Sequence, residues 1–120
     1  MIMSVDATVD RVIRAAIADK RLLAFRLDGL ERIAEPHDYG VRNGRPMLFV
    51  YQLEGGSRSG RLPDWRLVTV ANVSHVRMLE RTFGGPRIAP TGKHLVWDEL
   101  WASVSRPCGV ARRDPTADIC

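Results

Sequence analysis

The chain has 120 residues, of which 45% are hydrophobic and 27% are charged, and its formal net charge is +4 at neutral pH. This length allows one domain with a modest core, and the apolar fraction argues against disorder throughout the chain. No apolar run reaches the roughly 20 residues that span a bilayer, and no secretory signal is recognised at the start, so we expect a cytoplasmic protein.

The first expected element is an amphipathic helix. Ser4 or Asp6 can cap it, because a short side-chain oxygen accepts a hydrogen bond from an otherwise unpaired backbone N–H. Asp10 can pair with Arg14 one turn further on. The apolar residues that recur at helical spacing are Val5, Val9, Val12, Ile13, Ala16 and Ile17. We expect this stripe to close one end of a small barrel.

Two tight turns predict three consecutive strands. Asp28-Gly29 and Asn43-Gly44 are strong hairpin signals, because these residues tolerate the positive φ that a two-residue turn requires. Pro36 interrupts the middle strand by removing a backbone donor, and a proline inside such a strand marks an edge or a bulge. We predict a sharp bend there, of the kind that small barrels use to close. The three strands are expected over 22–27, from residue 30 or 31 to 41, and over 47–53.

A glycine-rich loop separates these strands from two more. Between residues 54 and 64 the hydrophobic periodicity is lost, and the segment is longer than barrel closure needs. Further strands are expected over 65–70 and 73–79, joined by Ala71-Asn72. One helix followed by five strands predicts a mainly β fold of the α+β class, arranged as a β-barrel.

The character of the sequence changes after residue 86. Apolar residues recurring at three and four positions predict a short amphipathic helix over 95–105. Its stripe packs on the barrel or contacts a second subunit or partner protein, and the contact residues are then Trp97, Leu100 and Trp101. We assign 1–86 to the barrel domain and 87–120 to a C-terminal extension that ends in a disordered tail.

Few residues suggest chemistry. Cys108 and Cys120 lie in the polar tail, which suits reduced thiols better than a disulfide framework. The histidines and cysteines lack a recognised ligand spacing, so no metal or other cofactor is expected. His37 beside Asp38 could form a catalytic pair, but neighbours in a strand point to opposite faces, which favours a structural histidine. We therefore do not expect an enzyme.

Arginines and aromatic residues are interleaved in the middle of the chain. A guanidinium that pairs with phosphate beside an aromatic face that stacks on a base suits a nucleotide or single-stranded nucleic acid. The alternative is that the aromatic residues fill the core and the arginines only solvate loops. The arginines are Arg42, Arg45, Arg58, Arg61 and Arg66.

One motif is Glu35-Pro36-His37-Asp38-Tyr39-Gly40-Val41, followed by Tyr51 and by Trp65-Arg66. It is the most specific part of a resemblance that covers residues 9–83. These segments resemble the WYL domain, most closely its small stand-alone bacterial forms. It implies an Sm-like, SH3-type barrel of five strands preceded by a helix. It also implies a sensing module that binds a small ligand or nucleic acid, often as part of a transcriptional regulator.

The sequence departs from the family at its name-giving motif, where Met47-Leu48-Phe49 replaces Trp-Tyr-Leu. No helix-turn-helix is expected ahead of the barrel, so operator recognition by this chain alone is not predicted. We predict a non-enzymatic ligand-sensing module for an anionic ligand, and the alternative is an interaction or dimerisation module that uses the Trp97/Trp101 helix. The predicted ligand-binding residues are His37, Tyr39, Tyr51, Arg58, Trp65 and Arg66.

Overall fold

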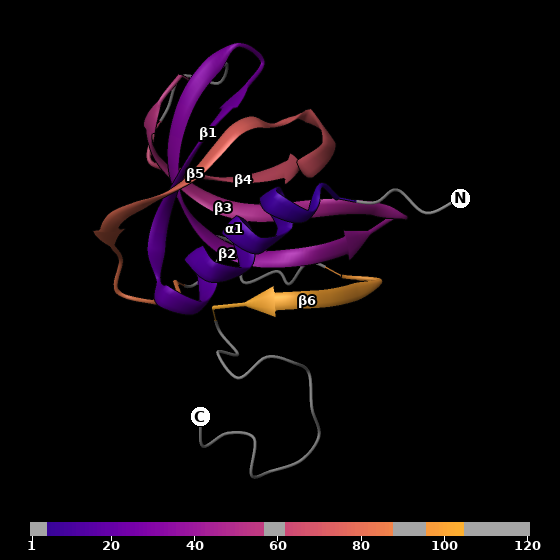
Figure 1. The fold of residues 1–120 in the computed structure, drawn as a ribbon. Helices are drawn as coiled ribbons and strands as arrows, with labels where there is room; N and C mark the ends of the chain where they lie inside the picture. Colours follow the sequence, from indigo (N-terminus) through magenta and orange to yellow (C-terminus); the bar gives the residue numbers. More distant parts are fainter. Residues whose placement is uncertain (1–4, 57–61, 88–95, 105–120) are drawn as a thin grey trace, which may run out of the picture.

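A computed structural model describes residues 5–56, 62–87 and 96–104. Figure 1 shows the N-terminal helix lying against an antiparallel sheet. The expected mostly β architecture with an N-terminal helix is therefore confirmed. The elements are α1 (Ala7–Asp19), β1 (Arg21–Leu27), β2 (Leu30–Arg42), β3 (Arg45–Gly55), β4 (Asp64–Thr69), the 3-10 turn η1 (Val70–Asn72), β5 (Ser74–Thr82) and β6 (Glu99–Ser103).

Capping residues set both ends of helix α1. The Asp6 carboxylate accepts hydrogen bonds from the backbone N–H groups of Thr8 and Val9, at 2.8 and 3.3 Å, and so caps the first turn. Lys20 adopts a left-handed conformation, with φ 54°, which ends the helix. Asp6 is thus the cap, and the alternative, Ser4, lies outside the described residues. The buried face consists of Ile13, Ala16 and Ile17.

Both predicted hairpin turns are confirmed. Asp28 and Gly29 have φ of 56° and 74°, and Asn43 and Gly44 have φ of 54° and 76°. Two successive residues with positive φ give the backbone twist that matches the strands on either side. These turns join β1 to β2 and β2 to β3 as adjacent antiparallel pairs.

The central strand of the sheet is β2. The sheet order is β4-β3-β2-β1-β5, and β6 pairs with β2 in addition. Because β3 lies along nearly the whole of one edge, the other edge of β2 is divided between β1, next to residues 30–34, and β6, next to residues 38–41. Within the described ranges β4 and β5 do not pair with each other, so the ladder is an open path rather than a closed ring.

A bulge interrupts β2 directly after Pro36, as the proline predicted. Pro36 pairs with Val50 and Asp38 pairs with Phe49, so His37 is an extra residue in the ladder. An extra residue reverses the alternation of side chains beyond it. Glu35 therefore lies on the same face as its cross-strand neighbour on β3, whereas Tyr39 turns to the opposite face, where it is completely buried.

The hydrophobic core lies between α1 and one face of the sheet. Along β3 the core residues alternate with half-buried ones, so Leu48 and Val50 face the core while Phe49 and Tyr51 face outward. We call the second side the outer face. The largest fully buried side chains include Tyr39, Phe25, Ile13, Leu22 and Leu23.

The expected C-terminal helix is wrong, because residues 99–103 form strand β6. The segment has helical spacing of its apolar residues, but it pairs with the part of the β2 edge that β1 leaves uncovered. The pairing is close: a Cβ on Gly40 would lie 2.2 Å from the carbonyl oxygen of Glu99. Strand β6 thus belongs to the same sheet as the segment before residue 86, while the expected disordered tail lies outside the described residues.

Placing a side chain at position 40 tests this pairing. We expect Gly40→Val to detach β6 and to lower the free energy of unfolding by about 2 kcal/mol, because the new Cβ overlaps backbone that cannot move independently. Urea unfolding followed by circular dichroism measures the loss, and limited proteolysis measures exposure of residues 96–104. The control is Gly84→Ala, where a Cβ meets nothing within 4 Å. Equal stability of the two variants would contradict the tight pairing.

Candidate functional site

The candidate site is built by strand register across the outer face. Glu35 on β2 lies directly opposite Tyr51 on β3, and Tyr51 lies directly opposite Trp65 on β4. Residues paired in this way have neighbouring side chains on one face. The register therefore places a carboxylate, a phenol and an indole in one row on three adjacent strands.

The two aromatic residues of this row lie in a larger group of rings. We call this group the outer aromatic cluster, and it consists of His37, Phe49, Tyr51, Trp65 and Phe83. Trp65 stacks on Phe49, with ring centroids 4.7 Å apart, and meets the Tyr51 ring edge-on at 5.1 Å. The His37 ring lies 4.9 Å from Trp65 and 5.4 Å from Phe83. The rings on β3 and β4 are half-buried, so part of their surface faces solvent.

An ion pair adjoins the cluster. Arg87 donates Nε–H to Glu35 Oε1 at 2.6 Å and Nη2–H to Oε2 at 2.8 Å, so both carboxylate oxygens are engaged. The same guanidinium lies over the Tyr51 ring, 4.3 Å from its centroid. The Glu35 side chain is 3% exposed and that of Arg87 is 45% exposed. A buried carboxylate thus holds a partly exposed cation against an aromatic face.

His37 shares this carboxylate, since its Nε2 lies 3.1 Å from Glu35 Oε1. Burial alone raises the pKa of Glu35, but the hydrogen bonds from Arg87 and His37 and the positive charge of Arg87 bring that pKa below its usual value. Burial lowers the pKa of His37, and the hydrogen bond to Glu35 offsets this only in part. At neutral pH the carboxylate is therefore ionised and the imidazole neutral, with its proton on Nε2.

The structure separates the predicted ligand-binding residues. It brings together His37, Tyr51 and Trp65, whereas Arg58 lies outside the described residues. Arg66 lies opposite Val50, on the core side of the sheet, and donates to Asp64 Oδ2 at 2.8 Å. Tyr39 also points to the core side, because the bulge at His37 turns it there. The cation beside the aromatic residues is Arg87, which sequence reasoning missed.

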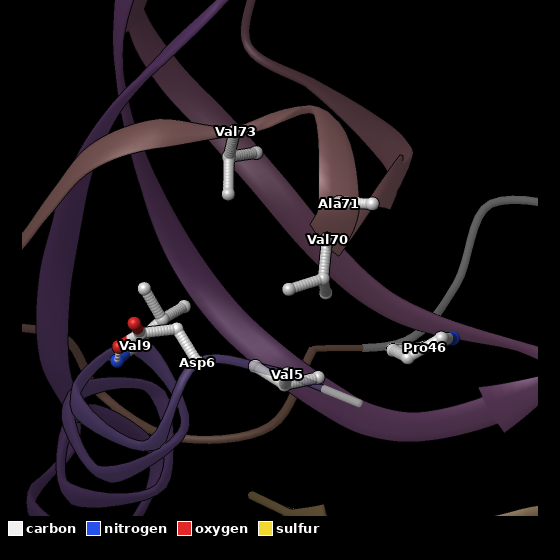
Figure 2. Close-up of a pocket in the computed structure, with 7 residues that line it drawn as sticks. All are labelled: Val5, Asp6, Val9, Pro46, Val70, Ala71 and Val73. Atoms are coloured by element: carbon white, nitrogen blue, oxygen red, sulfur yellow. Dashed lines mark hydrogen bonds between the residues drawn. The ribbon is translucent and has the colours of Figure 1, made fainter. Parts of the chain in front are cut away.

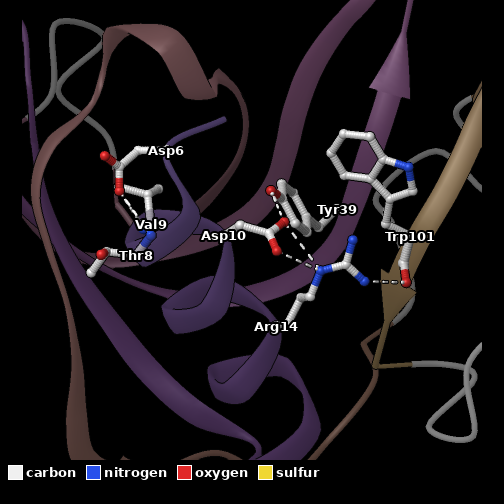
Figure 3. Close-up of polar contacts among 7 residues, drawn as sticks. All are labelled: Asp6, Thr8, Val9, Asp10, Arg14, Tyr39 and Trp101. Carbon is white, nitrogen blue, oxygen red and sulfur yellow. Dashed lines mark hydrogen bonds and ion pairs between the residues drawn. The ribbon is translucent and has the colours of Figure 1, made fainter. Parts of the chain in front are cut away.

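Tyr39 instead joins the helix to the sheet, as Figure 3 shows. Its buried hydroxyl donates to Asp10 Oδ1 at 2.7 Å, and Arg14 binds the same carboxylate at 3.0 Å, as the helical spacing predicted. Burial, with the hydrogen bond to Asp10, raises the pKa of Tyr39 well above its usual value. This arrangement is a structural link that holds the phenol neutral.

The residues predicted to contact a partner lie at or near β6. The ring of Trp101 packs edge-on against Tyr39, with centroids 5.1 Å apart, and the Arg14 guanidinium lies 5.6 Å from the Trp101 ring centroid. Trp97, before the strand, and Leu100, within it, are half-buried. Residues 99–103 therefore do not form the helical stripe that suggested a partner surface. Binding of a partner protein at β6 stays a prediction.

A pocket of about 300 Å³ lies elsewhere, between the start of α1 and η1. Figure 2 shows Val5 and Val9 on one side of it and Val70 and Val73 on the other. Its remaining lining residues are Asp6, Pro46 and Ala71. None of the predicted ligand-binding residues lines it, so the outer face is the better candidate site. Within the described ranges, no cluster of potential metal ligands is found, and no helix is long and apolar enough to cross a membrane.

The buried carboxylate and imidazole predict loss of stability in acid. Both pKa values are lower in the folded protein, so the unfolded chain binds protons more readily as the pH falls. The His37 contribution is lost as the pH falls below the usual imidazole pKa of 6.5, and the Glu35 contribution below the usual carboxyl pKa of 4.5. Urea unfolding across this range measures both. His37→Gln should remove most of the pH dependence of the free energy of unfolding between pH 6.5 and 4.5. An unchanged pH dependence in this variant would contradict the role of His37.

The hydroxyl of Tyr39 provides a second prediction. Tyr39→Phe removes the donor to Asp10 while Arg14 still satisfies the carboxylate, so we expect a loss of about 1 kcal/mol in the free energy of unfolding. Tyr51→Phe is the matched control, because the Tyr51 hydroxyl makes no hydrogen bond to the described residues. Thermal or urea unfolding compares the two, and equal effects would contradict a specific role for the Tyr39 hydroxyl.

Comparisons with protein families, with curated proteins and with solved structures find no match for this chain. The site is therefore interpreted from its own geometry: a stacked aromatic cluster on three strands, with a buried carboxylate that holds one arginine beside it. Such an arrangement offers aromatic surfaces on which a ring can stack and a positive charge beside them.

Proposed function

We propose that the protein is a non-enzymatic, WYL-like ligand-sensing or regulatory module that binds an anionic ligand, a nucleotide or single-stranded nucleic acid, on its outer face. The observation that carries this proposal is the position of Arg87 on Tyr51 beside the indole of Trp65. A planar base can stack on the aromatic surface while a phosphate pairs with the guanidinium.

The orientation of Arg87 supports a role in anion binding. Glu35 takes the Nε and Nη2 side of the guanidinium, and the side chain is 45% exposed. Nη1 carries two further N–H donors that Glu35 does not use, so a phosphate oxygen can approach them without breaking the ion pair. The bidentate pair fixes the plane of the guanidinium in advance, which reduces the ordering cost of binding.

The aromatic part of the site is held rigidly. Tyr51 and Trp65 lie on paired strands rather than in a loop, and Phe49 backs the indole at 4.7 Å. Side chains fixed on strands keep their spacing when a ligand arrives. Base stacking on such rings contributes about 1–3 kcal/mol per base.

The arrangement of elements supports a WYL-like, Sm-like barrel. The two strands at the ends of the sheet path, β4 and β5, are consecutive in the chain and are joined only by the short turn at residues 70–73. A short connection between the two end strands favours a sheet whose edges lie near each other, as a barrel requires. The helix before β1 covers the core face, as the resemblance implies.

Ligand titration tests this function. Labelled single-stranded oligonucleotides and nucleotides are titrated at about 50 and 200 mM salt, and binding should weaken with salt because phosphate contacts release counterions. Arg87→Ala should reduce the slope of log affinity against log salt by about 0.7 for a single strand. Trp65→Leu should weaken binding by about 1–3 kcal/mol with little change in that slope.

The control removes an equal charge from another strand, outside the outer aromatic cluster. Arg26→Ala lies on β1, in an exposed side chain that pairs with Glu31, and should leave affinity nearly unchanged. Binding that is insensitive to salt, or equally reduced by all three variants, would contradict a site at Arg87 and Trp65. Absence of binding to every anionic probe would reject the proposed function itself.

A further inference from the structure

We propose that Glu35 and Tyr51 form a receptor for a guanidinium group, that Arg87 occupies this receptor from within the chain, and that an arginine of a partner protein can take its place. This inference concerns a cationic group rather than an anion, so it goes beyond the proposed function and does not depend on it.

The receptor has the two features that recognise arginine rather than lysine. The Glu35 carboxylate receives two hydrogen bonds side by side from Nε and Nη2 of Arg87. The flat face of the same guanidinium lies on the Tyr51 ring at 4.3 Å from the centroid. A planar fork satisfies both contacts at once, whereas the compact ammonium of lysine cannot pair with both oxygens and stack.

The receptor is built into the sheet, whereas its occupant is not. Glu35 and Tyr51 are cross-strand neighbours on β2 and β3, and the Glu35 side chain is only 3% exposed. Arg87 follows the end of β5 at Thr82, outside any strand, and its side chain is 45% exposed. A partly exposed side chain from an irregular segment can leave at lower cost than a strand residue can move.

The buried charge explains why the receptor must always be filled. Removing the cation would leave the Glu35 carboxylate with the neutral His37 as its remaining partner, and an uncompensated buried charge is strongly destabilising. The folded protein therefore favours any guanidinium that replaces Arg87. An arginine on the same chain has a high effective concentration, so an outside arginine competes poorly until Arg87 is removed.

Removal of Arg87 tests the receptor directly. We expect the Arg87→Ala protein to bind N-acetyl-arginine amide about tenfold or more tightly than the wild type does, because the competing side chain is gone. N-acetyl-lysine amide should bind clearly more weakly, and Arg87→Ala combined with Glu35→Gln should show no preference for arginine. Tyrosine and tryptophan fluorescence, or chemical shifts of the Trp65 indole, report binding.

Stability provides a second measurement in the same variant. Methylguanidinium at millimolar concentration should raise the melting temperature of the Arg87→Ala protein, whereas methylammonium should not. If Arg87→Ala does not fold, recovery of the fold by methylguanidinium supports the receptor. The Arg87→Lys protein then serves for the binding comparison, since lysine keeps the charge but not the planar fork.

Equal binding of arginine and lysine probes, equal affinities in wild type and variant, or no binding to the variant would each overturn this inference. The anion titrations described above use different probes, and their deciding result is salt-sensitive binding of those probes to the wild-type protein. A negative result for anion binding therefore leaves the guanidinium receptor untouched, and a negative result for the receptor leaves anion binding untouched.

Discussion

The extra residue in β2 is the constraint on which the site depends. In an unbroken strand, residues 35, 37 and 39 would all face the same side. Because His37 is inserted into the ladder between the pairs of Pro36 and Asp38, the alternation reverses after it. Glu35 and His37 stay on the outer face, and Tyr39 turns into the core, where it binds the helix through Asp10. One strand thereby serves two opposite faces.

Much of the fold was readable in the sequence because its signals are local. The Asp28-Gly29 and Asn43-Gly44 turns, the Asp6 cap and the Pro36 bulge each depend on a few adjacent residues, and each is present. The C-terminal strand was not readable in this way. Its residues fit a helical spacing, and what makes them a strand is an uncovered stretch of β2 about 60 residues earlier.

The site was readable only in part for the same reason. Strand alternation is sufficient to place Tyr51 and Trp65 near one another once their strands pair, and the structure does so. The bulge was expected at the proline, but its effect on Tyr39 requires the exact register. The pairing of Glu35 with Arg87 spans 52 residues and depends on a segment with no periodic signal, so only the burial of the carboxylate could have indicated that a cation was needed.

The shared edge of β2 also allows one part of the sheet to open without the rest. Strand β1 and strand β6 occupy successive stretches of that edge without pairing with each other, so β6 can separate while the hydrogen bonds of β1, β2 and β3 stay intact. The backbone N–H of Val104 donates to the carbonyl of His37 at 2.7 Å, directly at the bulge. Amide hydrogens of β6 should therefore exchange by local opening, whereas those of the central strands should exchange only when the whole protein unfolds.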